Sequence, residues 1–253
     1  MLPLRLGAVS YLNARPLVYA LDAIRDQFDV RFDVPARCAA LLHDNAVDLG
    51  LIPAIEYLRG DYAIVPDVAI ASDGDVASVA VFTRKPMADV RSLALDASSR
   101  TSVALTRVLC ANHWNIAPVF VPAEPDLVIG DPAFEIDPVE RGVTKIDLGG
   151  EWKAMTGLPF VYAMWVGRPG VVSPSQCQAL QRARDGGVAN LAAIARSVSA
   201  GDPVRERRSL AYLRDNLKYG LGEAERAGLR RFHELAADIS VVPELKPLRF
   251  YES

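Results

Sequence analysis

The sequence predicts an α/β fold in two lobes, each a mostly parallel sheet flanked by helices, with a ligand cleft between the lobes. Three observations support this prediction. Short apolar segments alternate with helical ones over the first 60 or so residues, which is typical of parallel sheets. The alternation breaks at Lys85-Pro86 and then restarts. After residue 170 the pattern is almost entirely helical.

The first part of the chain supplies apolar strands separated by short helices. Alternating or continuous apolar runs predict strands, and apolar residues three or four positions apart predict helices. Pro16 fits the first turn of the first helix, where a missing N–H costs no hydrogen bond. We expect strands at 4–9, 28–32, 48–53 and 62–66, a valine-rich strand ending at 83, and helices at 16–24, 35–43 and 54–59.

The second part begins with a short strand at 93–95 and a helix that starts in the turn 98–102. Further strands are expected at 119–121, 127–130, 145–148 and 157–167, and helices from 131, at 149–156, 175–184, 188–199, 204–217 and 222–237. We expect the chain to cross over near residue 83 and return near 165. The first lobe then comprises 1–83 and 166–253, and the second comprises 84–165. Folds of the periplasmic-binding-protein kind are built in this way, and a single doubly wound domain is the alternative.

Composition narrows the function classes. The formal net charge is −3, and no basic cluster marks a nucleic-acid surface. The longest apolar run, 158–167, is too short to cross a bilayer. The first ten residues carry no secretion signal, and the three isolated cysteines suit a reducing compartment. We therefore expect a cytoplasmic protein with a small-molecule partner, no nucleic-acid partner and no membrane partner. The oligomeric state stays open.

Several common chemistries lack their sequence signatures. His43, His113 and His233 are scattered, without a metal ligand at helical or hairpin spacing. No strand is followed by a glycine-rich dinucleotide or phosphate loop, and no Gly-x-Ser-x-Gly elbow is present. We therefore expect no metal and no cofactor. The remaining candidates are polar and mostly uncharged side chains, which can hold a small oxygen-rich anion without offering a strong base.

The turn Ser98-Ser99-Arg100-Thr101-Ser102 is a candidate anion site. Its five polar residues stand where a helix begins, and helix N-termini carry unpaired N–H groups and a partial positive charge. The hydroxyls add hydrogen bonds, and Arg100 adds a guanidinium that suits a carboxylate. The alternative is a plain N-cap, with the other side chains solvated.

A second group of candidates lies in loops at strand ends. Ser10 and Asn13 follow the first strand, next to a helix start, and ligand crevices in open α/β sheets form at such places. Ser78 is the hydroxyl in an otherwise apolar strand, and Asp131 begins a short helix. Asn13 can instead be an ordinary N-cap, and Ser78 a strand hydroxyl bonded to its own backbone.

Four separated motifs carry a family resemblance. They are Val9-Ser-Tyr-Leu-Asn-Ala-Arg-Pro-Leu17, Leu51-Ile-Pro-Ala-Ile-Glu-Tyr57, Ala94-Leu-Asp-Ala-Ser-Ser-Arg-Thr-Ser-Val103 and Trp152-Lys-Ala-Met-Thr-Gly-Leu-Pro-Phe-Val-Tyr-Ala-Met-Trp165. In this order they resemble the chorismate dehydratases of the futalosine route to menaquinone, over nearly the whole chain up to residue 170. The dihydroxynaphthoate synthase of the same pathway is a related alternative, but Ser-Tyr-Leu-Asn after the first strand fits the dehydratase.

The resemblance implies a type II periplasmic-binding-protein fold and a lyase that converts chorismate to 3-[(1-carboxyvinyl)oxy]benzoate. It implies Asn13 and Ser78 as the catalytic pair. For substrate binding we expect Ser10, Tyr11, Ser98, Ser99, Arg100, Thr101, Ser102 and Asp131. Chorismate carries two carboxylates, and we expect the turn Ser98–Ser102 to bind one of them. The acceptor of the C3 proton stays open between a protein carboxylate and a carboxylate of the substrate. A binding protein for small carboxylates, without chemistry, is the alternative from a different functional class.

Overall fold

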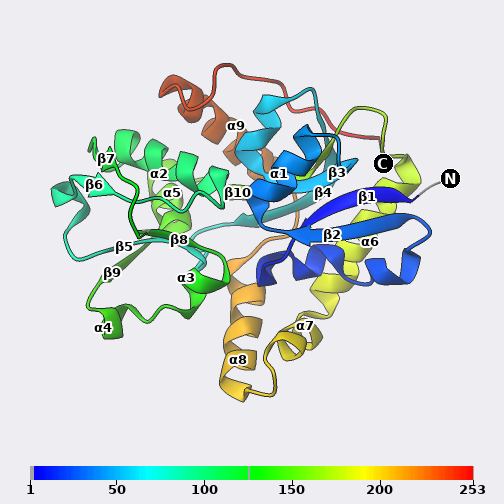
Figure 1. Cartoon of the computed structure of the whole chain (residues 1–253), viewed down its shortest axis with the longest axis horizontal. Helices are drawn as coiled ribbons and strands as arrows, with labels where there is room; N and C mark the ends of the chain where they lie inside the picture. The colour runs from blue at the N-terminus through cyan, green and yellow to red at the C-terminus, as the bar shows by residue number, and fades with distance from the viewer. Residues whose placement is uncertain (1–2, 125, 253) are drawn as a thin grey trace.

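In a computed structural model, which describes residues 3–124 and 126–252, the chain forms two lobes, each around its own sheet (Figure 1). The larger lobe holds a five-stranded sheet in the order β2-β1-β3-β10-β4. The smaller lobe holds the three-stranded sheet β8-β5-β9 and the pair β6-β7, which an isolated bridge between Leu95 and Leu127 connects to β8. The predicted two-lobed α/β fold is confirmed.

The larger sheet is parallel except for one strand. Its strands are β1 (Leu4–Val9), β2 (Phe28–Asp33), β3 (Leu49–Pro53), β4 (Ala63–Ser72) and β10 (Phe160–Gly167). β1 pairs with β2 and β3 in parallel, whereas β10 runs antiparallel between β3 and β4. Every residue of β10 is buried, which explains its continuous apolar and aromatic sequence.

The smaller sheet follows the same plan. It contains β5 (Val79–Thr83), β8 (Leu127–Ile129) and β9 (Thr144–Asp147), and the added pair is β6 (Ser92–Leu93) and β7 (Val119–Phe120). β5 runs antiparallel to both of its neighbours. In each lobe, therefore, the antiparallel strand is the one that enters from the other lobe.

Sheet membership bears on where the chain passes between the lobes. β5 belongs to the smaller sheet and β10 to the larger sheet. The chain accordingly leaves the larger sheet after Ser72, and it re-enters that sheet at Phe160. The division into 1–83 with 166–253 and 84–165 stays a prediction.

The first helical segment differs from the expectation. In place of a helix over 16–24, the chain forms two short 3₁₀ helices, η1 (Leu12–Val18) and η2 (Leu21–Ile24). Pro16 lies inside η1 and cannot donate a backbone hydrogen bond, and Ala20 between the two helices has a left-handed φ of 58°. The predicted α1 (Pro35–His43) is confirmed, and 54–59 is also a 3₁₀ helix, η3 (Ala54–Arg59).

Helices flank the sheet of the smaller lobe, and the C-terminal helices extend from the larger lobe to the junction of the two lobes (Figure 1). The smaller lobe has η4 (Met87–Asp89), α2 (Arg100–Asn112), α3 (Asp131–Glu135), α4 (Pro138–Arg141) and α5 (Leu148–Thr156). The C-terminal part has α6 (Pro174–Ala189), α7 (Leu191–Val198), α8 (Pro203–Ala211), the π-helical turn η5 (Tyr212–Asn216) and α9 (Glu223–Asp238). Within the described residues, no helix is long and apolar enough to cross a membrane.

Close packing against α6 holds the segment that carries Asn13. Gly187 of α6 lies directly against the backbone of Pro16 in η1, where a Cβ atom would overlap the Pro16 carbonyl group. Glycine at this position therefore lets α6 approach η1 closely enough to bury Leu12, Ala14, Pro16 and Leu17. The result is a fixed loop after β1 that faces the smaller lobe.

Candidate functional site

A cavity lies between the two lobes, and residues of both lobes form its wall. The lining combines apolar side chains with amide, hydroxyl and phenol groups: Val9, Tyr11, Asn13, Pro35, Pro53, Ile70, Val76, Ser78, Val79, Ser99, Ser102, Ile129, Gly130, Tyr162 and Ala163. Five of the predicted site residues are in this set.

Asn13 and Ser78, the predicted catalytic pair, both line the cavity. Asn13 lies in η1, just after β1 of the larger sheet, and Ser78 directly precedes β5 of the smaller sheet. Asn13 Oδ1 is buried and has no hydrogen-bond partner among the described residues. A buried acceptor left unpaired costs about 1–3 kcal/mol. Asn13 is therefore poised for a ligand that brings a donor.

The Ser98–Ser102 turn divides into two parts. Ser99 caps α2, because its Oγ accepts from Ser102 N at 3.4 Å and lies 2.9 Å from Ser102 Oγ. Ser99 and Ser102 line the cavity at the N-terminus of this 13-residue helix. Ser98 stands outside the lining, with a buried Oγ that has no partner in the described part of the chain. The hydroxyl groups of Ser99 and Ser102 therefore both cap the helix and line the cavity.

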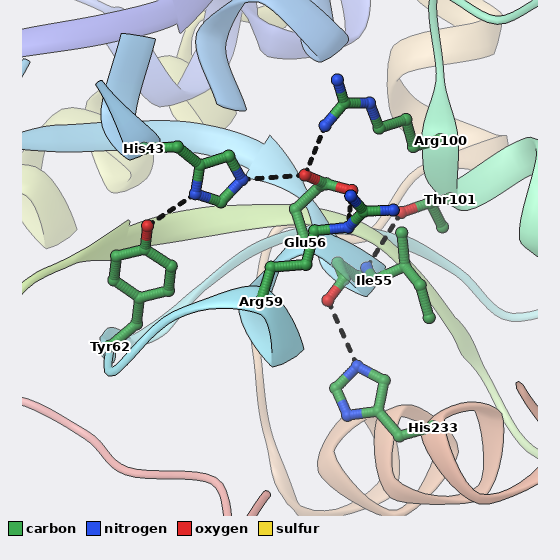
Figure 2. A network of polar contacts seen from close by, with 9 residues as sticks. His43, Ile55, Glu56, Arg59, Tyr62, Arg100, Thr101 and His233 are labelled. Carbon is green, nitrogen blue, oxygen red and sulfur yellow. Dashed lines mark hydrogen bonds and ion pairs between the residues drawn. The ribbon is translucent and has the colours of Figure 1, made fainter. Parts of the chain in front are cut away.

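Arg100 and Thr101 are not in the cavity lining, and their side chains point toward η3 (Figure 2). Arg100 Nη1 donates to Glu56 Oε2 at 2.6 Å, and Thr101 Oγ1 accepts from Ile55 N at 3.2 Å. Both contacts join the start of α2 in the smaller lobe to η3 in the larger lobe. These two residues accordingly connect the lobes and do not form the cavity wall.

Glu56 is the centre of this connection. Its side chain is completely buried, and its carboxylate lies 2.9 Å from Arg59 Nε and 2.8 Å from His43 Nε2, in addition to Arg100. His43 Nδ1 is in turn 2.6 Å from Tyr62 Oη. Burial is the largest effect on the pKa of Glu56 and raises it, but the His43 hydrogen bond and the two arginine charges together outweigh burial and lower that pKa. Glu56 is therefore a charged anchor.

Ser10, Tyr11 and Asp131 lie at a second contact between the lobes. Asp131 Oδ1 at the start of α3 accepts from Leu12 N in η1 at 3.1 Å, and burial raises the pKa of Asp131. Ser10 and Asp131 line a separate small pocket beside the cavity. The Tyr11 ring lines the cavity itself and lies against Gly130. Gly130 has a φ of 68° and leaves no room for a Cβ atom beside this ring.

Two tyrosines near the cavity were missed by the sequence-based expectations. Tyr162 lines the cavity, and its Oη lies 3.0 Å from Ser72 Oγ. Its position in the aromatic strand 157–167 was the available signal. Tyr212 Oη donates to Ser78 Oγ at 2.7 Å. Tyr212 lies in the helical C-terminal part, 134 positions from Ser78, so local patterns gave no sign of it.

The cavity has no strongly basic or acidic wall. Its lining, which consists of described residues, includes no carboxylate, imidazole, amine or guanidinium group. Burial raises the pKa of Tyr162 well above its usual value, so this phenol stays protonated. The described residues also contain no group of three His, Cys, Asp or Glu side chains that could hold a metal ion. The cavity can therefore orient an anion through hydrogen bonds and the positive end of α2.

The sequence matches a family model described as menaquinone biosynthesis over residues 4–238. It is 30% identical over 262 residues to a chorismate dehydratase from Thermus thermophilus, covering 92% of this chain and 95% of that protein. It is also 30% identical over 166 residues to a chorismate dehydratase from Campylobacter jejuni, covering 62% of this chain and 64% of that protein.

Solved structures share the fold at low sequence identity. Protein AF1704 from Archaeoglobus fulgidus has a TM-score of 0.73 at 17% identity, covering 95% of this chain and 98% of that chain. The alkanesulfonate-binding protein SsuA from Xanthomonas axonopodis pv. citri, bound to MOPS, has a TM-score of 0.65 at 17% identity, covering 94% and 92%. These similarities support a two-lobed binding-protein architecture.

Proposed function

Since the chain belongs to the menaquinone biosynthesis family, we propose that it is a hydro-lyase that dehydrates chorismate to 3-[(1-carboxyvinyl)oxy]benzoate. The observation that carries this proposal is the similarity to a chorismate dehydratase along almost the full length of both chains. The cavity between the lobes, with Asn13 on one side and Ser78 on the other, supplies a matching site.

The cavity suits the two ends of the substrate differently. One carboxylate of chorismate meets the N-terminus of α2, where Ser99 and Ser102 offer hydroxyl groups and the first-turn N–H groups are available. Apolar side chains such as Ile70 and Ile129 pack against the ring. Because both lobes contribute to the wall, the bound substrate is held in one orientation and shielded from water.

The proposed reaction breaks the C3–H and C4–O bonds, and the ring becomes aromatic as water departs. Asn13 and Ser78 hydrogen-bond the departing hydroxyl group or the charge that develops on the ring carboxylate. The described lining contains no protein carboxylate, which favours the enolpyruvyl carboxylate of the substrate as acceptor of the C3 proton. That proton and the C4 hydroxyl group then leave as water.

Substitution of the pair tests these roles. We expect Asn13→Ala and Ser78→Ala each to lower kcat for chorismate by about 10²–10³, the usual loss for one donor that stabilises developing charge. Michaelis kinetics followed by the absorbance of the benzoate product measure this effect. If both variants keep near-full kcat while KM rises, the pair only binds substrate and the catalytic assignment is wrong.

Two other expectations belong to the same proposal. We infer a cytoplasmic enzyme without a nucleic-acid partner, which the formal net charge of −3 and the free, buried Cys38, Cys110 and Cys177 support. A carboxylate-binding protein without chemistry would bind chorismate tightly and release no water, so the same assay separates it from a lyase. Activity on a dihydroxynaphthoate precursor instead of chorismate would favour the related synthase.

A further inference from the structure

We propose that Tyr212 is a positioning residue that makes the Ser78 hydroxyl group a hydrogen-bond donor toward the cavity. The inference rests on the proposed function of the cavity. Tyr212 Oη donates to Ser78 Oγ at 2.7 Å, and both side chains are buried. Tyr212 is not part of the cavity lining, and its hydroxyl group faces the side chains of Ser78 and Asn13, which are.

The direction of this hydrogen bond decides what Ser78 can do. A serine hydroxyl group has one hydrogen and two acceptor lone pairs. When Tyr212 occupies a lone pair, the Ser78 hydrogen must find a different acceptor. Burial raises the pKa of Tyr212 well above its usual value, although Ser78 and Asn13 act in the opposite direction, so the phenol keeps the proton that it donates to Ser78. The Ser78 hydrogen is therefore available to a ligand oxygen in the cavity.

The position of Tyr212 is fixed by the turn that carries it. Tyr212 begins η5, a π-helical turn that continues α8, and α8 runs toward the junction of the lobes (Figure 1). Its ring lies 5.0 Å from the Phe134 ring of α3. From the same turn, Asn216 Nδ2 donates to Asp75 O at 2.9 Å. η5 thus holds the crossover before β5 at two points, and π-helical turns often occur at functional sites.

The backbone around Ser78 is held by other residues. Ala77 has a left-handed φ of 65°, its N–H donates to Asp147 Oδ2 at 2.6 Å, and its carbonyl oxygen accepts from Lys145 Nζ at 2.5 Å. Ser78 O accepts from Gly130 N at 2.8 Å. We therefore expect Ser78 to stay in place when the Tyr212 hydroxyl group is lost. Only the Ser78 hydroxyl hydrogen is then no longer directed toward the cavity.

Tyr212→Phe tests this inference in a double-mutant cycle with Ser78→Ala. We expect Tyr212→Phe to lower kcat for chorismate roughly five- to tenfold, about the worth of one neutral hydrogen bond, with KM changed by less than about twofold. The double variant should have the kcat of Ser78→Ala alone, because the proposed effect of Tyr212 passes through the Ser78 hydroxyl group. Rates are normalised to the fraction of folded protein that binds the product, so a partial folding defect does not count.

Tyr57→Phe is the matched control. It also removes a buried hydroxyl group, which donates to Pro247 O at 2.7 Å and accepts from Arg249 N at 2.9 Å, but Tyr57 is not in the cavity lining. We expect a lower melting temperature and an unchanged kcat for this variant. An unchanged kcat in Tyr212→Phe, or a loss in the double variant equal to the product of the two single losses, overturns the inference alone. A wild-type protein without chorismate turnover overturns the proposed function and this inference with it.

Discussion

Glu56→Gln keeps the size of a completely buried side chain but removes the negative charge that joins the two lobes. The carboxylate lies 2.6 Å from Arg100 and 2.9 Å from Arg59, and 2.8 Å from His43. Removing one partner of a buried ion pair typically costs about 3–5 kcal/mol. The side chains of these three partners stay 38%, 56% and 24% exposed, so water can solvate them after the substitution. We therefore expect a smaller loss in the free energy of unfolding, about 2–3 kcal/mol.

Thermal unfolding at pH 7 measures this loss. In a chain of this length, about 1 kcal/mol shifts Tm by roughly 2–4 °C, so we expect Glu56→Gln to melt roughly 5–10 °C lower. Asp61→Asn is the control, because its 2.6 Å pair with Arg249 is exposed on both sides, at 76% and 58%. Such a surface pair contributes less than about 1 kcal/mol. If both variants melt at the same temperature, the Glu56 cluster does not hold the lobes together.

The contribution of Glu56 to the free energy of unfolding should decrease at acid pH. The pKa of Glu56 is lowered in the folded protein, so its contribution is complete above the unfolded value near 4.5 and is lost as the pH falls through the folded pKa. The stability difference between wild type and Glu56→Gln should accordingly shrink below about pH 4. A difference that stays constant to acid pH contradicts the charged-anchor interpretation.

Two further predictions concern single residues near the cluster and the cavity. Burial lowers the pKa of His233 to about 4, and its Nε2 donates to Ala54 O at 3.2 Å. Because the unfolded chain binds this proton below about 6.5, wild type should lose up to about 1.4 kcal/mol per pH unit between pH 6.5 and 4, and urea unfolding of His233→Gln should show a flatter profile. Gly130→Ala places a Cβ atom 2.9 Å from the Tyr11 ring at a φ of 68°. We expect this variant to lose about 1–3 kcal/mol of stability and to raise KM for chorismate severalfold, and a wild-type KM would show that the Tyr11 wall is not needed for binding.

Much of the fold follows from local sequence patterns, and the exceptions have local causes. The strands β1 to β3 and the helix α1 are apolar runs or faces with clear ends, and they form close to where they are expected. The expected helix over 16–24 is interrupted at Ala20, whose left-handed conformation separates η1 from η2, and η1 begins at Leu12, so Pro16 lies inside it and not at its first turn. The antiparallel direction of β5 and β10 depends on how the chain passes between lobes, which hydrophobic periodicity does not encode.

In the site, too, local sequence patterns predict some residues, and long-range contacts place the others. Asn13 and Ser99 lie in the segments that follow β1 and β6, each at a helix between strands, where ligands bind in α/β sheets, and both line the cavity. Arg100 stands in the same turn, but Glu56 binds it from 44 positions earlier in the chain. Tyr212 reaches Ser78 only through the packing of the C-terminal helices. Contacts of such long sequence separation cannot be deduced from motifs or spacing. The roles of Asn13, Ser78 and the turn Ser98–Ser102 stay predictions until they are measured.

Mass spectrometry of the product tests the central claim most directly. Purified wild-type protein is incubated with chorismate alone, and the product is compared with that formed by Asn13→Ala. We expect a benzoate that has lost one water and still carries the enolpyruvyl group, formed much faster by wild type than by the variant. A product that has lost pyruvate, or unchanged chorismate bound to the protein, would contradict dehydration in this cavity.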